Sequence, residues 1–261
     1  VPSTYQILIN KTNFLENDFP SVRYFTQAGG KLANKFIMDI DRAFPRKLFF
    51  VMYGATEATA RLSYLPSDLV GKKLGSIGKG IPNVELKVVG ADGKPVKPGE
   101  IGEIVASGDN IMKGYYKDAD ETLKVLKNGK FYTKDLAVVD DEGFIYIVGR
   151  SSDMIKSAGY KIFPNEIEEV VGSIKHVLDC VVFGLQDDIM GEAIVAAVLT
   201  KEPSEKLKAE ILLHCKKVLP SYKIPKYITF FDDFPLNSSN KIDKPKIKEL
   251  ASLKIKQWTS K

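Results

Sequence analysis

The sequence has few of the residues from which disulfide frameworks and metal centres are built. Its 261 residues include only two cysteines, Cys180 and Cys215, and two histidines, His176 and His214. Two cysteines without metal-ligand spacing argue against a disulfide scaffold, and they favour a reduced, cytoplasmic setting. We interpret both thiols as packing residues. Neither histidine falls in a motif that would give it a role.

Long apolar runs are missing as well. No stretch reaches the ~18 consecutive apolar residues that a membrane helix needs. No basic segment followed by an apolar core opens the chain. The sequence therefore predicts no membrane span. Its composition, 44% hydrophobic and 27% charged, is that of a globular protein with one large or two ordinary domains.

The positive charge is concentrated in the last part of the chain. The net charge is +5, yet residues 201–261 alone hold 14 lysines against 7 acidic residues. The lysines follow a helical pattern, and few aromatic residues stand between them. No signature of a nucleic-acid-binding module accompanies them. We expect a solvated surface and no nucleic-acid partner, although an anionic small ligand or an acidic protein would also suit it.

The first 150 residues show two kinds of pattern. Between residues 24 and 64, a helical stretch at 32–44 and an apolar run at 48–52 indicate α/β structure. Between residues 71 and 149, short runs of period two separated by turn residues predict a small antiparallel sheet or barrel. We therefore interpret residues 1–150 as the end of a large domain, an α/β portion followed by a β barrel.

A second domain, residues 151–261, is predicted to be α+β. Asn165 and Glu168 have the spacing of a capping box, which predicts that a helix begins there. Further patterns predict strands at 180–184, 193–199 and 227–231 and a helix at 204–219.

The segment Tyr53-Gly54-Ala55-Thr56-Glu57 follows the apolar strand, so its polar groups would emerge at the carboxyl edge of a sheet, where α/β folds bind ligands. Alone, it would be interpreted as a loop at a helix start. The segment nevertheless resembles a signature of the adenylate-forming superfamily, which includes acyl-CoA synthetases. The resemblance implies that Tyr53 stacks on adenine, that Thr56 contacts a phosphate, and that Glu57 helps to hold magnesium.

Two further segments resemble motifs of the same family. Gly29 and Gly30, otherwise interpreted as a turn, resemble the pair that passes close to the adenine. Asp135, otherwise a turn-capping residue, resembles the aspartate that accepts hydrogen bonds from the ribose hydroxyls. Lys134 stands where the family usually has glycine.

The longest resemblance begins at Gly149 and extends to Glu168, over about a dozen spaced positions. It implies that Arg150 binds the ribose and that Ser152 is the hinge of a mobile lid. The family often has Asp or Lys at the hinge, but serine can absorb a torsional change too. The same resemblance implies that the loop of Gly159, Tyr160 and Lys161 enters the site for thioester formation.

Residues 235–243 resemble the terminal lysine motif of the family. As one of many lysines in this region, Lys241 would be interpreted as a solvated surface charge. The resemblance instead implies that Lys241 reaches the substrate carboxylate and the α-phosphate. Asn240 stands where the family usually has glycine.

Taken together, the resemblance implies part of an AMP-forming ligase that uses ATP, Mg²⁺ and coenzyme A to convert a carboxylic acid into its acyl-AMP and then a thioester. A carrier-protein phosphopantetheine is the alternative acceptor. A noncatalytic nucleotide-binding or interaction module is the alternative of another class. The family's Ser/Thr/Gly-rich phosphate loop is absent from these 261 residues, so we expect the chain to be a fragment.

We predict that the purified 261-residue chain does not adenylate any acid, because the loop that would grip the β- and γ-phosphates is absent from it. Pyrophosphate exchange into ATP is the assay, with a panel of carboxylic acids. Exchange above the protein-free background would contradict the prediction.

Overall fold

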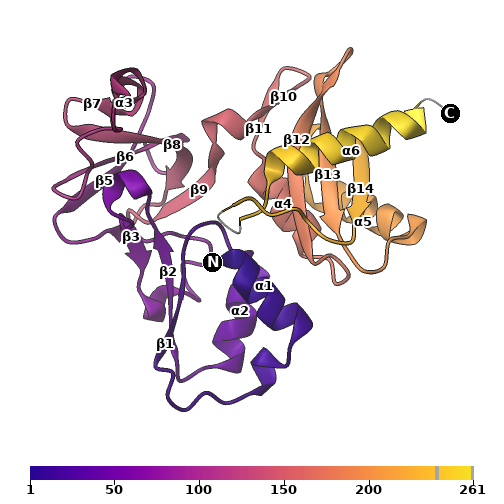
Figure 1. The fold of residues 1–261 in the computed structure, drawn as a ribbon, viewed down its shortest axis with the longest axis horizontal. Helices are drawn as coiled ribbons and strands as arrows, with labels where there is room; N and C mark the ends of the chain where they lie inside the picture. The colour runs from indigo at the N-terminus through magenta and orange to yellow at the C-terminus, as the bar shows by residue number, and fades with distance from the viewer. Residues whose placement is uncertain (239–240, 260–261) are drawn as a thin grey trace. The chain divides into compact units, whose positions relative to one another are not determined.

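The computed structural model describes residues 1–238 and 241–259. The chain forms two compact units, Val1–Ser151 and Ser152–Lys261. Figure 1 colours the first from indigo to pink and the second from pink to yellow. Each unit has its own hydrophobic core. Among the described residues, no helix has the length and hydropathy required to cross a membrane.

The first unit opens with an α/β layer. Helices α1 and α2 pack with a four-stranded sheet of order β1-β2-β3-β4, in which β1 and β2 are parallel. On β2, Phe49 and Val51 are buried in the core that the layer shares with α2. The bounds are α1 (Pro2–Lys11), β1 (Tyr24–Gln27), α2 (Asn34–Ala43), β2 (Leu48–Tyr53), β3 (Ser63–Leu65) and β4 (Lys79–Gly80).

The rest of the first unit is a curled antiparallel sheet. Its strands are ordered β5-β6-β8-β7, with β9 paired to β8, and every ladder is antiparallel. The bounds are β5 (Val84–Val89), β6 (Gly102–Gly108), α3 (Ala119–Val125), β7 (Leu126–Lys127), β8 (Lys130–Val139) and β9 (Ile145–Arg150). The predicted order of an α/β portion and then antiparallel β structure is confirmed.

The second unit is a five-stranded sheet with helices on both faces. Alternate residues of β12 point to opposite sides, so Val182 packs with α4 and α5, whereas Val181 packs with α6. Strand β13 is buried from Ala193 to Val198 because both of its faces are covered. The helices are α4 (Pro164–Gly172), α5 (Glu205–Val218) and α6 (Lys244–Thr259). The strands are β10 (Ile155–Ser157), β11 (Tyr160–Ile162), β12 (Asp179–Asp187), β13 (Gly191–Leu199) and β14 (Tyr227–Phe231).

The start of α4 differs from the prediction. The helix is present, but Phe163 is its N-cap, Pro164 occupies the first turn, and no side chain caps it. The predicted capping box is therefore wrong. Proline is well suited to the first turn because its fixed φ is helical and it has no N–H to satisfy. Glu168 instead links α4 to β12, because its carboxylate accepts a hydrogen bond from the Val182 N–H at 3.0 Å.

The packing of α6 generates a stability prediction. Ile247 is fully buried in the cluster between α6 and the sheet, whereas Leu253 on the same helix is 52% exposed. Ile247→Ala should lower the free energy of unfolding by ~2–5 kcal/mol, because it leaves a cavity. The matched change Leu253→Ala should cost only about 0.5 kcal/mol. Urea denaturation followed by circular dichroism compares the two, and equal costs would contradict the packing described.

Candidate active site

Three polar residues that are far apart in the sequence meet in the first unit. Tyr53 ends β2, Asp135 lies within β8 and Arg150 ends β9. The Tyr53 hydroxyl donates to Asp135 Oδ2 at 2.6 Å, and Arg150 Nε donates to Asp135 Oδ1 at 2.8 Å. We call these three residues the Asp135 cluster. The cluster joins the α/β layer to the curled sheet, and it unites three of the residues singled out in the sequence.

A bulge in β8 sets the position of Asp135. Val105 faces Tyr132 and Glu103 faces Leu136, so residues 133–135 lie opposite Ile104 alone. Thr133 fills the irregularity: its hydroxyl donates to the Ile104 carbonyl at 2.9 Å and accepts from the Asp135 N–H at 3.1 Å. Such extra residues bend a strand and redirect its side chains. The bulge therefore aims the Asp135 carboxylate at Tyr53.

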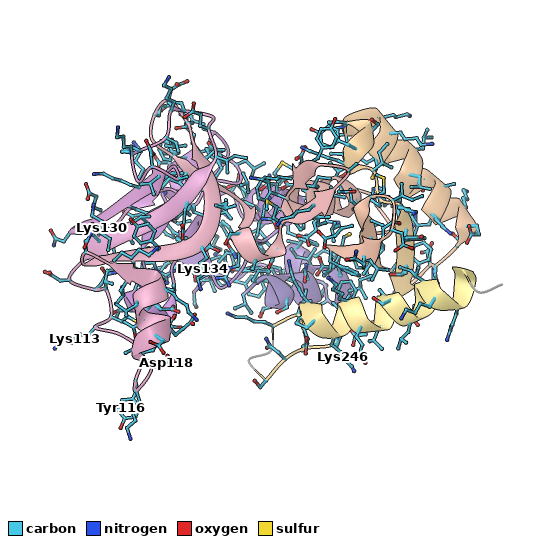
Figure 2. All side chains as sticks on the ribbon, turned by 90° about the horizontal axis from the view of Figure 1, so that it is seen from above. Lys113, Tyr116, Asp118, Lys130, Lys134 and Lys246 are labelled. Atoms are coloured by element: carbon cyan, nitrogen blue, oxygen red, sulfur yellow. The ribbon has the colours of Figure 1, made fainter. Side chains whose placement is uncertain are left out.

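Lys134 is the residue of this bulge whose backbone is left-handed. Its φ is +63°, a left-handed conformation that favours glycine over residues with a side chain. The Lys134 N–H donates to a carboxylate oxygen of Glu103 at 2.8 Å, which holds the backbone in place. Figure 2 shows the Lys134 side chain on this sheet. The departure from the family's usual glycine thus leaves the left-handed geometry intact.

Burial and charge differ across the Asp135 cluster. Asp135 is buried with 8% of its surface exposed, whereas the Arg150 side chain is 62% exposed. The Asp135 carboxylate therefore accepts one hydrogen bond from the phenol of Tyr53 and one from the solvent-exposed guanidinium of Arg150. Burial, together with the neighbouring Asp135, holds the pKa of the Tyr53 phenol well above its usual range. Tyr53 is consequently a neutral donor at physiological pH.

The turn after β2 carries Thr56 and Glu57 on a short 3-10 helix, η2 (Thr56–Ala58). Gly54 is required here because a Cβ would lie 2.1 Å from the Ala60 carbonyl oxygen, so any side chain would collide with backbone. Thr56 is exposed, and Glu57 is partly buried. The carboxylate of Glu57 accepts a hydrogen bond from the Tyr115 hydroxyl at 2.7 Å, and this contact raises the pKa of Tyr115 to about 12.

Sequence reasoning missed Tyr115. The Gly114-Tyr115-Tyr116 run does not distinguish the two tyrosines. Only the fold shows that Tyr115 reaches Glu57, which lies 58 positions earlier in the chain.

Glu57 fits the kind of magnesium site that the family implies. Within the described residues, no group of three or more His, Cys, Asp or Glu side chains is arranged to hold a metal ion. Mg²⁺ is usually bound by one or two carboxylates together with waters and substrate phosphates, because it dehydrates reluctantly. A single hard carboxylate, oriented by a hydrogen bond at one oxygen, suits that mode of binding.

Gly29 and Gly30 lie between β1 and α2, against the first residues of the chain. Gly29 has φ +84°, and a Cβ there would approach the side chain of Val1 to 3.1 Å. The buried amide of Gln27 donates to the Gly30 carbonyl, which fixes the course of the turn. The missing side chains leave room for Val1 and Pro2 beside the turn, and both glycines remain exposed.

The remaining predicted residues belong to the second unit, which begins at Ser152. Ser152 lies in a 3-10 turn, η4 (Ser151–Asp153), and its hydroxyl donates to the Asp153 carboxylate at 2.8 Å. Gly159 stands at the tip of the β10–β11 hairpin. Ser157 pairs with Tyr160 across a two-residue turn in which Ala158 and Gly159 both have positive φ, as type I′ turns require.

The two side chains after Gly159 differ in their surroundings. Lys161 is exposed, and Tyr160 stacks on Tyr222 with ring centroids 4.1 Å apart and an interplanar angle of 11°. The stacked ring braces one side of the hairpin against η5 (Ser221–Lys223).

Lys241 lies in the connection between β14 and α6. Its backbone pairs with Asn237, whose N–H donates to the Lys241 carbonyl at 2.8 Å and whose side chain accepts from the Lys241 N–H at 3.0 Å. Lys241 is exposed. Asn240, the position of the family's usual glycine, lies outside the described residues.

Comparison with known families tests the family resemblance found in the sequence. Residues 1–116 match the family model of AMP-binding enzymes, and residues 166–241 match that of the AMP-binding enzyme C-terminal domain. The chain belongs to the AMP-binding enzyme family. The predicted family is thereby confirmed.

Curated relatives of this AMP-binding enzyme include acid–CoA ligases. A long-chain-fatty-acid–CoA ligase of Escherichia coli O6:H1 is 32% identical over 98% of this chain and 45% of its own length. An indoleacetate–CoA ligase of Aromatoleum aromaticum is 32% identical over 97% of the chain and 49% of its own length. The chain spans about half the length of the curated relatives it matches.

Solved structures of CoA synthetases have the same fold. The o-succinylbenzoate CoA synthetase of Bacillus subtilis, bound to its acyl-adenylate intermediate, superposes with a TM-score of 0.83 at 31% identity. The match covers 95% of this chain and 49% of that one. The same synthetase, bound to ATP and a magnesium ion, superposes with a TM-score of 0.80 at 31% identity, over 94% of this chain and 50% of that one.

The Asp135 cluster generates a prediction about stability. Asp135→Ala should lower the free energy of unfolding by ~1–3 kcal/mol, because it leaves the buried Tyr53 hydroxyl without an acceptor. The simultaneous loss of the ion pair with the exposed Arg150 should add little to this fall in the free energy of unfolding. In the Tyr53→Phe background, which has no hydroxyl to satisfy, Asp135→Ala should cost less. A double-mutant cycle by urea denaturation should therefore give a coupling of about 0.5–3 kcal/mol, and simple additivity would contradict it.

Proposed function

We propose that the chain is part of an ATP-dependent carboxylic acid:CoA ligase that forms an acyl-AMP and then an acyl-CoA thioester. The observation that carries the proposal is the Asp135 cluster, because residues from three strands meet at the end of β2 beside Gly54, Thr56 and Glu57. The names of the relatives, which are acid–CoA ligases and CoA synthetases, support the same reaction.

In the proposed site, the Asp135 cluster binds the nucleoside. Among the described residues, each Asp135 oxygen accepts one hydrogen bond, and a carboxylate oxygen has a second lone pair with which it can accept from a ribose hydroxyl. Arg150, mostly exposed, contributes a second ribose contact. The ring of Tyr53 offers a face on which adenine can stack, with the bare backbone of Gly29 and Gly30 as a further contact for the base.

Thr56 and Glu57 are proposed to serve the phosphates. The exposed Thr56 hydroxyl is a donor for a phosphate oxygen, and Glu57 is the residue that would hold magnesium. When bound, the ion neutralises negative charge on the phosphates that separate. The substrate carboxylate attacks the α-phosphorus, forming one P–O bond while the bond to pyrophosphate breaks.

The second unit is proposed to be a mobile lid that turns at Ser152. In one position, Lys241 would lie between the carboxylate and the α-phosphate and offset the repulsion of two anions. In the other, the Gly159 hairpin would admit the thiol of coenzyme A. The sulfur then attacks the acyl carbon, the bond to AMP breaks, and the thiol proton is released. The Gly159 hairpin joins β10 to β11 and Lys241 lies between β14 and α6, so the two proposed roles fall on different connections.

We also propose a cytoplasmic site of action. Both cysteines are buried free thiols, as expected of a protein that works in a reducing compartment.

The test separates the two half-reactions in the complete gene product. Lys241→Ala should lower adenylation from acid and ATP by about 10²–10³-fold, because it removes a preorganised charge from that transition state alone. Thioester formation from supplied acyl-AMP should fall much less. Lys246→Ala is the matched control, since Lys246 pairs with Glu249 on the surface of α6 (Figure 2).

The outcome that would overturn the role of Lys241 is an equal loss of both half-reactions in a folded protein. Failure of the wild-type protein to form acyl-AMP from any tested acid would overturn the proposed ligase as a whole.

A further inference from the structure

The turn that carries Glu57 cannot hold that side chain by itself. Helix η2 is only three residues long, and it runs directly into Thr59 and Ala60, which have φ of +52° and +68°. Left-handed conformations are unfavourable for residues with a side chain, and most of all for β-branched threonine. Such a turn persists only when its surroundings hold it in place.

Residues 110–115 provide that support. The Asn110 side-chain amide donates to the carbonyls of Ala58 and Arg61, each at 3.0 Å, and the Asn110 carbonyl accepts from the Thr59 hydroxyl at 2.8 Å. The Met112 N–H donates to the Glu57 carbonyl at 2.7 Å. The backbone of the turn is therefore tied on both sides of its left-handed residues to a segment some 50 positions later in the chain.

Tyr115 extends this support to the functional group itself. Its hydroxyl donates to one carboxylate oxygen of Glu57, Oε1, at 2.7 Å. Among the residues that the structure describes, no donor contacts the other oxygen, Oε2. A carboxylate held at one oxygen keeps the second free for a hard cation and cannot rotate away from it.

Tyr115 is in turn fixed from its own backbone. Its N–H donates to the Thr122 hydroxyl at 2.9 Å, and Thr122 lies on α3, which is capped by Asp118. The preceding Gly114 allows this approach, because a Cβ there would lie 2.9 Å from the Thr122 methyl group. The Tyr115 side chain is therefore anchored to the curled-sheet part of the first unit.

We propose that Tyr115 is the positioning residue that orients Glu57 toward the magnesium ion of MgATP. The inference rests on the proposed function, since it assigns Tyr115 a part in that site. It predicts that loss of the hydroxyl weakens metal binding while leaving the nucleoside contacts of the Asp135 cluster intact.

The experiment uses the complete gene product and Mn²⁺ as a spectroscopic substitute for Mg²⁺. Binding of Mn²⁺ in the presence of a non-hydrolysable ATP analogue is measured by electron paramagnetic resonance, and binding of AMP without metal is measured by calorimetry. Tyr115→Phe should weaken Mn²⁺ binding about 10–100-fold, as changes to partners of metal ligands do. AMP affinity and the melting temperature should stay at the wild-type values.

Tyr116→Phe is the matched control. Tyr116 is the next residue and is 87% exposed, and Figure 2 shows its side chain extending away from the ribbon. The Tyr116→Phe variant should bind Mn²⁺ with the affinity of the wild type. A second variant checks that the effect passes through the carboxylate: in a Glu57→Ala background, Tyr115→Phe should cause no further loss.

Unchanged Mn²⁺ affinity in Tyr115→Phe would overturn the inference. An equal fall in Mn²⁺ and AMP affinity would overturn it too, because it would show that Tyr115 only stabilises the fold of the site. If the wild-type protein bound neither AMP nor Mn²⁺ with the ATP analogue, the proposed function would fail and the inference with it. That result is distinguishable from the other two, in which the wild type binds both.

Discussion

The Asp135 carboxylate is the constraint on which the site of the first unit depends. A buried charge is costly unless hydrogen-bond donors compensate it, and the two donors come from different layers. Tyr53 ends a strand of the α/β layer, whereas Arg150 ends the strand beside Asp135 in the curled sheet. Satisfying one carboxylate thus fixes where the ends of β2 and β9 meet, and this is where Gly54, Thr56 and Glu57 follow.

The bulge in β8 shows how a sequence that departs from its family keeps the same geometry. A left-handed residue costs roughly 1–2 kcal/mol when it carries a side chain, so Lys134 is a poorer choice than glycine at this point. The Thr133 hydroxyl donates to the Ile104 carbonyl and the Glu103 carboxylate accepts from the Lys134 N–H, and these two bonds hold the bulge in place. The position of Asp135 therefore depends on the side chains of Thr133 and Glu103, and the identity of Lys134 alone decides little.

The sequence predicts best those features that depend on local chemistry. The helix at Glu205–Val218 follows an apolar pattern, and Ser204 caps it by accepting a hydrogen bond from the Leu207 N–H, so its place near 204–219 could be predicted. The start of α4 could not, because Glu168 is drawn to β12 instead of its own helix end. Tyr115 was missed for the same reason: its partner lies in another element, and only tertiary structure brings them together. Motif resemblance compensates for this limit, since it places Tyr53, Asp135 and Arg150 in one site without deriving their contacts.

The second unit carries its proposed working groups on connections between the elements of one compact body. Gly159 sits in a tight two-residue turn, Lys241 is tied by its backbone to Asn237, and the sheet between them is buried on both faces. A core packed in this way resists internal deformation, because interiors of near-crystalline density do not deform gradually. If the unit acts as a lid, the tight Gly159 turn is not built to travel far by itself. The motion is then concentrated in the backbone at the start of the unit, where Ser152 is exposed and its hydroxyl donates to the neighbouring Asp153 carboxylate.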